Sequence, residues 1–432
     1  MQSKKNKTIT IITVGFALFA MFFGAGNLIL PPYIGLVAGG QWPASLIGFF
    51  STAILAPFLG VLMVAVSGTS FFDLGKKIHP KFIDVLALLI ILCIGPMVAI
   101  PRTGATTYEI GIAPSFPWFD NIVFSVIFFA VVLALSISQT KIVDIIGKVL
   151  TPFLLVSLLA LVVLGILYPA QAPAVATLDT TQAFMFGFTE GYQTLDVLAS
   201  VIFAGIIISA VINSGYTSVG ERTKVTIAAG IVSTAALLFI YGGLIYLGAT
   251  TDLAFTQSVS RTDLLLYISQ SILGSSGTYV ISVAIAFACL TTAIALTSAT
   301  GMFVERISSG RISYRYGVIA CVLVSAFLSV NSVDEIIRYA VNILLFVYPI
   351  TFVLIVYVLL FGRLVKTRLP YIAAIVAAAV VSFISVLENM EINLFYVYEF
   401  KNTIPLSEHS LEWVLPSFVA FVAFALVSRR MK

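Results

Sequence analysis

The chain has 432 residues, of which 60% are hydrophobic and only 10% are charged, and its formal net charge is +4. A soluble protein is about one quarter charged, so this composition excludes a water-soluble protein and indicates an integral membrane protein in a lipid bilayer. The positive charges fit membrane orientation better than nucleic-acid binding. We expect no nucleic-acid partner and no obligatory protein partner.

Twelve apolar segments fill the chain, and a membrane span needs about 20 such residues. They lie at residues 8–38, 43–67, 82–112, 119–138, 142–168, 181–212, 223–249, 275–305, 313–330, 333–361, 370–387 and 411–428, separated by polar connections of which 250–274 and 388–410 are the longest. The first segment lacks a small-residue cleavage site, so we expect a span and not a signal peptide. The prediction is an all-α, multi-pass integral membrane protein with a single domain over residues 1–432.

The basic residues predict the orientation, because Lys and Arg concentrate in cytoplasmic connections. If the spans alternate and the amino terminus is cytoplasmic, 19 of the 23 basic residues lie inside. The other four, Arg102, Arg261, Arg338 and Lys401, lie on the outer side or in an outer half-helix. We predict that both termini are cytoplasmic.

The cysteines and histidines carry no recognisable catalytic or metal motif. Cys93, Cys289 and Cys321 fall inside predicted spans, while His79 and His409 lie in connections on opposite sides. No Ser or Cys nucleophile accompanies a base, so we expect that the protein is not an enzyme.

The first predicted span is interrupted by the stretch FFGAGNLILPP, Phe22 to Pro32. Backbone groups freed inside a bilayer must find other partners. The sequence predicts one break at Gly24-Ala25-Gly26-Asn27 and a second at Pro31-Pro32.

The sixth span is interrupted as well, by Glu190-Gly191-Tyr192-Gln193-Thr194-Leu195-Asp196. Five spans separate the two breaks, and an odd repeat length inverts the second copy. We predict an inverted repeat of residues 8–168 and 181–361, followed by two extra helices within 370–428. Matching discontinuous helices point to the binding site of a transporter, although glycine pairs also let helices pack closely.

A broken helix offers amino-terminal N–H groups to a carboxylate and carbonyl groups to a cation. Such a site suits a zwitterion accompanied by a metal ion. Asp196 is a candidate for the ammonium group, with a helix-capping role as the alternative. Glu190 lies nearer the outer surface.

Two further motifs supply polar groups. Arg102, within GPMVAIPRTGATTYEIG, could pair with Glu109, Glu190 or Asp334 as an outer gate, or extend to the lipid headgroups. Thr291 and Thr292, within CLTTAIALTSA, offer two hard oxygens to a small cation; alternatively they bond to carbonyls of their own helix.

FFGAGNLILPP, GPMVAIPRTGATTYEIG and YQTLDVLASVIF together resemble the bacterial branched-chain amino acid:cation symporter family, over nearly the whole chain. The resemblance implies a LeuT-type fold of five plus five helices, with helices 1 and 6 broken, in the bacterial plasma membrane. It also implies alternating-access import of leucine, isoleucine and valine coupled to sodium, without an organic cofactor. The alternatives are proton coupling, or sodium symport of another small neutral amino acid.

The resemblance also implies site residues. The sodium ligands would be the carbonyls of Ala20, Phe23 and Ala288 and the hydroxyls of Thr291 and Thr292. The substrate would meet the first break at Gly24, Ala25, Gly26 and Asn27, the sixth break at Tyr192, Thr194 and Asp196, and a pocket wall at Phe203. An acidic residue at position 196 departs from the small polar residue of distant relatives, which suggests ammonium binding or a role in proton coupling.

Overall fold

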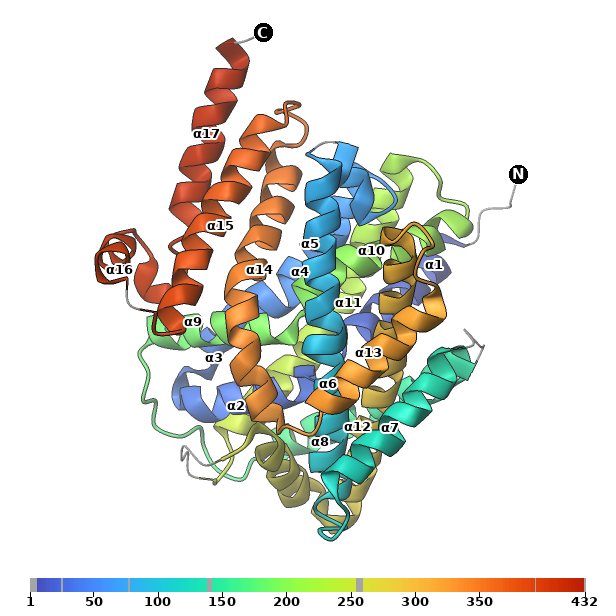
Figure 1. Ribbon diagram of the computed structural model, residues 1–432. Coiled ribbons are helices and arrows are strands. Elements are labelled where there is room, and N and C mark those ends of the chain that lie inside the picture. Colours follow the sequence, from blue (N-terminus) through green and yellow to red (C-terminus); the bar gives the residue numbers. More distant parts are fainter. Residues whose placement is uncertain are drawn as a thin grey trace.

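A computed structural model describes residues 6–24, 26–76, 78–137, 142–253, 259–392 and 394–430. These residues form helices joined by short connections, and no strand occurs among them. Figure 1 shows the helices packed side by side, with the start of α1 and the end of α17 toward the same side of the molecule.

Each predicted span is occupied by helical structure. The α-helices are α1 (Lys7–Phe22), α2 (Gly26–Ala38), α3 (Trp42–Phe49), α4 (Ala56–Ser67), α5 (Pro80–Leu92), α6 (Ala99–Thr106), α7 (Asn121–Ser136), α8 (Ile142–Leu167), α9 (Thr180–Glu190), α10 (Asp196–Asn213), α11 (Val219–Ala249), α12 (Arg261–Ile307), α13 (Tyr314–Leu328), α14 (Val333–Phe361), α15 (Leu369–Asn389), α16 (Phe395–Asn402) and α17 (Val414–Arg430). Short 3-10 or π turns connect or extend several of them, among them η2 (Phe50–Leu55), η4 (Cys93–Met97), η5 (Thr107–Ile112) and η6 (Gly191–Thr194).

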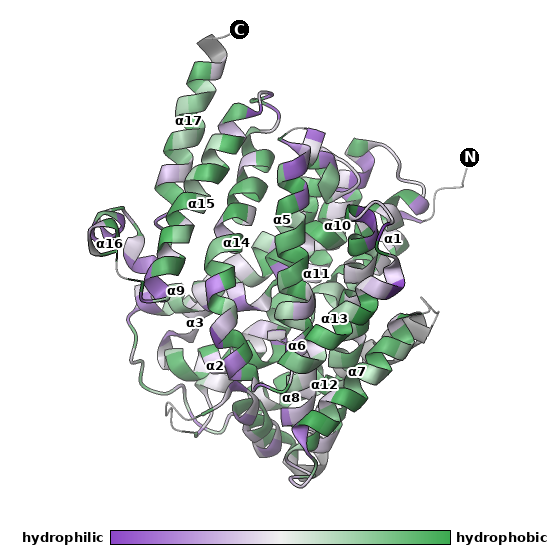
Figure 2. Cartoon of the chain, viewed as in Figure 1, coloured by the Kyte–Doolittle hydropathy of each residue, from purple (hydrophilic) through white to green (hydrophobic). Residues whose placement is uncertain are grey.

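The outer surface of the helices is apolar, as contact with lipid requires. Within the described residues, seven helical segments are long and apolar enough to cross a membrane, and five more apolar helices are shorter. Large side chains such as Val126 and Phe327 are 61% and 78% exposed, and Figure 2 shows hydrophobic residues along α5, α13, α15 and α17. A multi-pass membrane protein follows, while the exact count of spans and the inverted repeat stay predictions.

The interruptions predicted at residues 24–27 of the first span and 190–196 of the sixth span are both present. The first helix stops at Phe22 and resumes at Gly26. The sixth segment stops at Glu190, passes through η6, and resumes at Asp196 after Leu195, which has a left-handed φ of 66°. Few residues other than glycine adopt this backbone conformation, so tertiary packing holds Leu195 in it.

Pro31 and Pro32 do not make the second break that the sequence predicts, because α2 runs through both of them. Inside a helix, proline removes one backbone hydrogen bond and its ring crowds the carbonyl four residues earlier, so other contacts must hold the helix together there. Here α2 packs closely against α11, since a Cβ atom on Gly248 would collide with the carbonyl of Pro32. That packing supports a continuous helix across the two prolines.

Two connections contain more helix than the sequence predicts. Residues 261–273, placed in a polar connection, form the first part of α12, which kinks at Gly274 where φ is 67°. The connection 388–410 contains the short helix α16. The third span is also kinked, at Gly95, with φ −94° and ψ −119°.

Glycines mark the two closest helix contacts around the breaks. On α2 and α11, a Cβ atom at Gly35 would overlap the carbonyl of Ile245, as one at Gly248 would overlap that of Pro32. On α3 and α9, Gly48 and Gly187 make the same kind of backbone approach. One half-helix at each break, α2 at the first and α9 at the sixth, is thus held against a neighbouring helix by backbone-to-backbone packing.

Replacing Gly248 with leucine should therefore destabilise the protein. A side chain there has no space, and overpacking costs about 1–3 kcal/mol. We expect a lower midpoint of thermal unfolding in detergent, measured by intrinsic fluorescence. Gly220→Leu on the same helix is the control, because no atom lies within 4 Å of a Cβ at that position; equal midpoints for the two variants would contradict the packing described.

Candidate functional site

A buried hydrogen-bond network joins the two helix breaks. The Asn27 side-chain nitrogen lies 2.7 Å from Asp196 Oδ2 and 2.7 Å from the Tyr241 hydroxyl, and it also donates to the carbonyl of Phe22. The Tyr241 hydroxyl is 3.3 Å from the same carbonyl. One asparagine therefore connects the end of α1, the start of α10 and the middle of α11.

This network provides hydrogen-bond partners for a backbone group that the first break leaves free. The last carbonyls of a helix have no partner within it, and here that of Phe22 accepts from two side chains. All three side chains of the network are nearly inaccessible, with Asp196 6% and Asn27 1% exposed. The structure thus places Asn27 and Asp196 together, as the prediction of one site at both breaks requires.

Asp196 begins α10, and its local contacts bear on the capping alternative. Its backbone N–H lies 3.4 Å from the Thr194 hydroxyl, which itself donates to the carbonyl of Gly191. The position before the helix is Leu195, which makes no side-chain capping bond. The helix dipole stabilises a carboxylate in the first turn, but the Asp196 carboxylate also accepts a hydrogen bond from Asn27, on the other broken helix.

The eighth predicted span faces the first break. A Cβ atom built on Gly24 would lie 3.8 Å from the Thr292 methyl group of α12. The Thr291 hydroxyl donates to the carbonyl of Ala288 at 2.9 Å, which leaves its oxygen lone pairs available. Ala20 lies in the last turn of α1 and Phe23 caps that helix. The structure therefore brings Gly24 of the first break close to Thr292 of α12. A sodium site formed by oxygens of Ala20, Phe23, Ala288, Thr291 and Thr292 stays a prediction.

The remaining predicted substrate residues lie on the sixth segment, apart from Ala25, which is outside the described residues. Tyr192 is buried and stacks on Tyr348 of α14, with ring centroids 3.8 Å apart. Its hydroxyl has no hydrogen-bond partner among the described residues. Phe203 is buried on α10, two turns beyond Asp196. Their contact with a substrate stays a prediction.

The structure places Arg102 at the helix breaks and not in an outer gate or at the headgroups. Arg102 is 3% exposed, and its Nη1 atom donates to the carbonyl of Gln193 at 2.6 Å. It lies seven residues before Glu109 along the third span. At about 1.5 Å per helical residue, the two positions are roughly 10 Å apart along the span.

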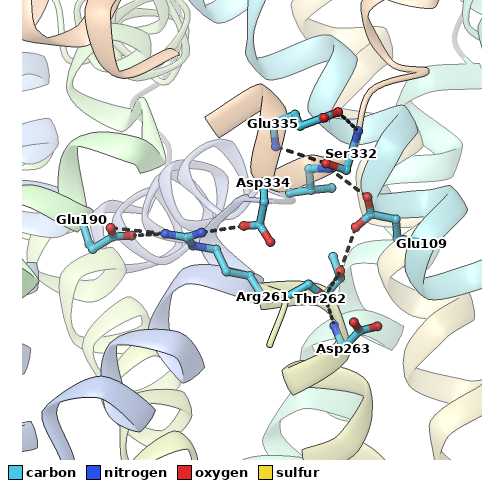
Figure 3. A network of polar contacts seen from close by, with 10 residues as sticks. Glu109, Glu190, Arg261, Thr262, Asp263, Ser332, Asp334 and Glu335 are labelled. Carbon is cyan, nitrogen blue, oxygen red and sulfur yellow. Dashed lines mark hydrogen bonds and ion pairs between the residues drawn. The ribbon is translucent and has the colours of Figure 1, made fainter. Parts of the chain in front are cut away.

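Arg261 supplies the positive charge of the outer network instead. Its guanidinium lies 2.5 Å from an oxygen of Asp334 and 3.4 Å from Glu190, and it covers the ring of Tyr33 at 4.2 Å. Figure 3 shows Arg261 between the two carboxylates. Burial alone would lower the pKa of Arg261, but Glu190 and Asp334 raise it above its usual value. The network joins α2, α9, α12 and α14, on the side of the breaks that the predicted orientation makes the outer one.

Glu109 belongs to the same outer region through hydrogen bonds. One oxygen accepts from the Thr262 hydroxyl at 2.7 Å and the other from the Val333 N–H at 2.9 Å. An open cavity of about 710 Å³ lies outside this layer, lined in part by Glu109, Asp263 and Asp334. The predicted gate residues Glu109 and Glu190 are thus brought together, whereas Arg102 is not among them.

Sequence reasoning missed three residues of this site: Tyr241, Arg261 and Tyr33. Arg261 carried a usable signal, because it is one of only four basic residues expected on the outer side. Tyr241 is a hydroxyl within an apolar run, a weak signal in a chain with 17 tyrosines. Nothing in the local sequence distinguishes Tyr33.

Comparison with known proteins agrees with this geometry. Residues 7–431 match the family model described as branched-chain amino acid transport protein. The branched-chain amino acid permease BraB of Bacillus subtilis is 34% identical, over 95% of this chain and 94% of the permease.

Two solved structures share the LeuT-type fold. Mhp1, a nucleobase-cation-symport-1 family transporter in a closed conformation with bromovinylhydantoin bound, aligns with a TM-score of 0.62 at 14% identity, over 97% of this chain and 92% of Mhp1. MhsT in complex with L-phenylalanine aligns with a TM-score of 0.58 at 15% identity, over 99% of each chain. The family model that matches nearly the whole chain describes transport proteins, so this chain is a transporter and not an enzyme.

Removing the outer ion pairs should open the outer side. In a Gln193→Cys background, we expect Arg261→Gln to raise the rate of labelling of that position by a membrane-impermeant thiol reagent by about tenfold, because a partly buried charge pair is lost. The matched control is Asp263→Asn, which removes a carboxylate of the same cavity that is exposed. Equal labelling of Arg261→Gln and the parent would show that the network does not close the site.

Proposed function

Because this chain belongs to the family of branched-chain amino acid transport proteins, we propose that it is a secondary symporter that imports leucine, isoleucine and valine together with sodium. The observation that carries the proposal is the meeting of two helix breaks through Asn27 and Asp196. Discontinuous helices of this kind mark the substrate and ion sites of transporters.

Sodium would bind where the end of α1 faces α12. The ligands are the carbonyls of Ala20, Phe23 and Ala288 and the hydroxyls of Thr291 and Thr292. The contact between Gly24 and Thr292 supports this assignment, and so does the partial negative charge at the carboxyl end of a helix. Bound sodium would order the end of α1 and so complete the adjacent substrate site.

The substrate would lie between the two breaks. Its carboxylate would meet the N–H groups of Ala25 and Gly26 at the start of α2, and Asp196 would receive its ammonium group. Phe203 would contribute to an apolar pocket for the branched side chain. One methylene group in such a pocket discriminates by only about 1–3 kcal/mol, so leucine, isoleucine and valine should share the site.

Transport would proceed by alternating access in the bacterial plasma membrane, with both chain termini in the cytoplasm. The outer ion-pair layer around Arg261 would act as the outer gate. One positive charge moving through 100 mV supplies about 2.3 kcal/mol, and a tenfold sodium gradient adds about 1.4 kcal/mol. One sodium ion per substrate would therefore support accumulation by several hundred-fold.

Proton coupling is the second candidate, because a carboxylate lies buried at the sixth-helix break. Asp196 is 6% exposed and contacts the other broken helix through Asn27. Buried carboxylates in membrane proteins often carry protons. In that case Asp196→Asn should abolish pH-dependent accumulation of leucine, while leucine exchange persists.

The test is uptake of radiolabelled leucine into proteoliposomes, first with an imposed sodium gradient and then with a proton gradient alone. The proposal expects uptake driven by sodium and competed by isoleucine and valine. Uptake driven only by protons would assign the coupling role to Asp196 or Glu190. No uptake under either gradient would contradict the substrate assignment.

Removing the paired hydroxyls should weaken sodium coupling. We expect Thr291→Ala and Thr292→Ala each to raise the sodium concentration for half-maximal leucine uptake by about tenfold, since a ligand to a charged group contributes about 1.5–3 kcal/mol. Thr300→Ala on the same helix is the control, because that hydroxyl bonds to Leu296 away from the break. An unchanged sodium dependence in both variants would place the ion elsewhere.

A further inference from the structure

Arg102 is a buried cation at the point where the two broken helices meet. It is 3% exposed on α6, inside the third predicted span. A charged side chain within a membrane protein is costly and usually functional. The outer network does not use Arg102, since Arg261 makes its ion pairs.

The guanidinium of Arg102 contacts both breaks. Its Nη1 atom donates to the Gln193 carbonyl in η6. Its other end lies against Gly26, the first residue of α2, where a Cβ atom would collide with Nη2 and Cζ. The side chain therefore lies beside the amino terminus of α2, which already attracts negative charge.

Asp196 provides the opposite charge nearby, yet no ion pair between Arg102 and Asp196 occurs in the described part of the chain. Each is held by a neutral group: Arg102 by the Gln193 carbonyl and Asp196 by the Asn27 amide. Buried charges are normally paired, because desolvation is costly. A ligand with one group of each sign would satisfy both.

We propose that Arg102 binds the carboxylate of the amino-acid substrate, opposite the ammonium group at Asp196. The inference rests on the proposed transport function and adds a specificity-determining residue to it. A guanidinium presents five N–H donors in a planar fork that matches a carboxylate, and the Gln193 bond uses one of them. The recognised class is then the zwitterionic α-amino acid, with amines and free carboxylic acids rejected.

Gly26 and Gln193 position the Arg102 guanidinium in different ways. Gly26 leaves the space that the guanidinium occupies, and any side chain there would displace it. The Gln193 carbonyl orients the fork from the sixth-helix break. Movement of either half-helix would thus move the carboxylate-binding group, which links substrate binding to the positions of both broken helices.

The test compares two ligands on purified protein in sodium buffer. Leucine and leucinamide share a side chain and an ammonium group, but leucinamide has a neutral amide in place of the carboxylate. Affinities are measured from the ligand-induced rise in the thermal unfolding midpoint. In the parent protein we expect leucine to bind about 10- to 100-fold more tightly, the effect of a charge-assisted hydrogen bond.

In Arg102→Gln we expect the affinity for leucine to fall by about 10- to 100-fold, while the affinity for leucinamide changes less than about threefold. The preference for leucine over leucinamide should therefore disappear. Arg102→Lys should keep part of the preference, because it keeps the charge and loses the fork. Arg338→Gln, an exposed outer arginine, is the matched control and should keep the full preference. Asp196→Asn should still bind leucine more tightly than leucinamide. It should no longer bind leucine more tightly than 4-methylpentanoate, which lacks the ammonium group.

A parallel loss of both ligands in Arg102→Gln and Arg102→Lys would overturn the inference, since it would make Arg102 a structural bridge between the breaks. A parent protein that binds leucine and leucinamide equally would overturn it as well and leave the transport function standing. A parent that binds no branched-chain amino acid would instead contradict the proposed function itself.

Discussion

The rest of this structure depends on one constraint: a backbone group released inside a membrane must find a partner within the protein. At the first break the Phe22 carbonyl finds Asn27 and Tyr241, and at the sixth the Gln193 carbonyl finds Arg102. These partners come from different helices, so satisfying the backbone also gathers charged and polar side chains at one place. The candidate binding site is thus a consequence of breaking the helices.

The small residues at the breaks decide what can approach them. Gly24 faces Thr292 and Gly26 faces Arg102, so each glycine of the first break opens toward a different part of the site. At the sixth break, Gly191 leaves space for the Thr52 hydroxyl, which a Cβ atom at this position would overlap. Close packing of α2 on α11 and of α3 on α9 then holds the half-helices in register.

The helical segments and both interruptions could be predicted from the sequence, because apolar length and a glycine, asparagine or carboxylate inside an apolar run are local signals. The position of Arg102 could not, since it depends on the kink at Gly95 and on depth along the third span. The predicted break at Pro31-Pro32 was wrong for a related reason, because packing against Gly248 supports the helix across the two prolines. Long-range contacts, such as Tyr241 with Asn27, have no local sequence signal at all.

The most direct measurement is a cryo-electron microscopy map of the purified protein with leucine and sodium. We predict density for the amino acid between Gly26 of α2 and Asp196 of α10, with a separate peak for the ion between the end of α1 and Thr292. Density for leucine only in the outer cavity beside Asp263, with the two breaks still joined through Asn27, would contradict it.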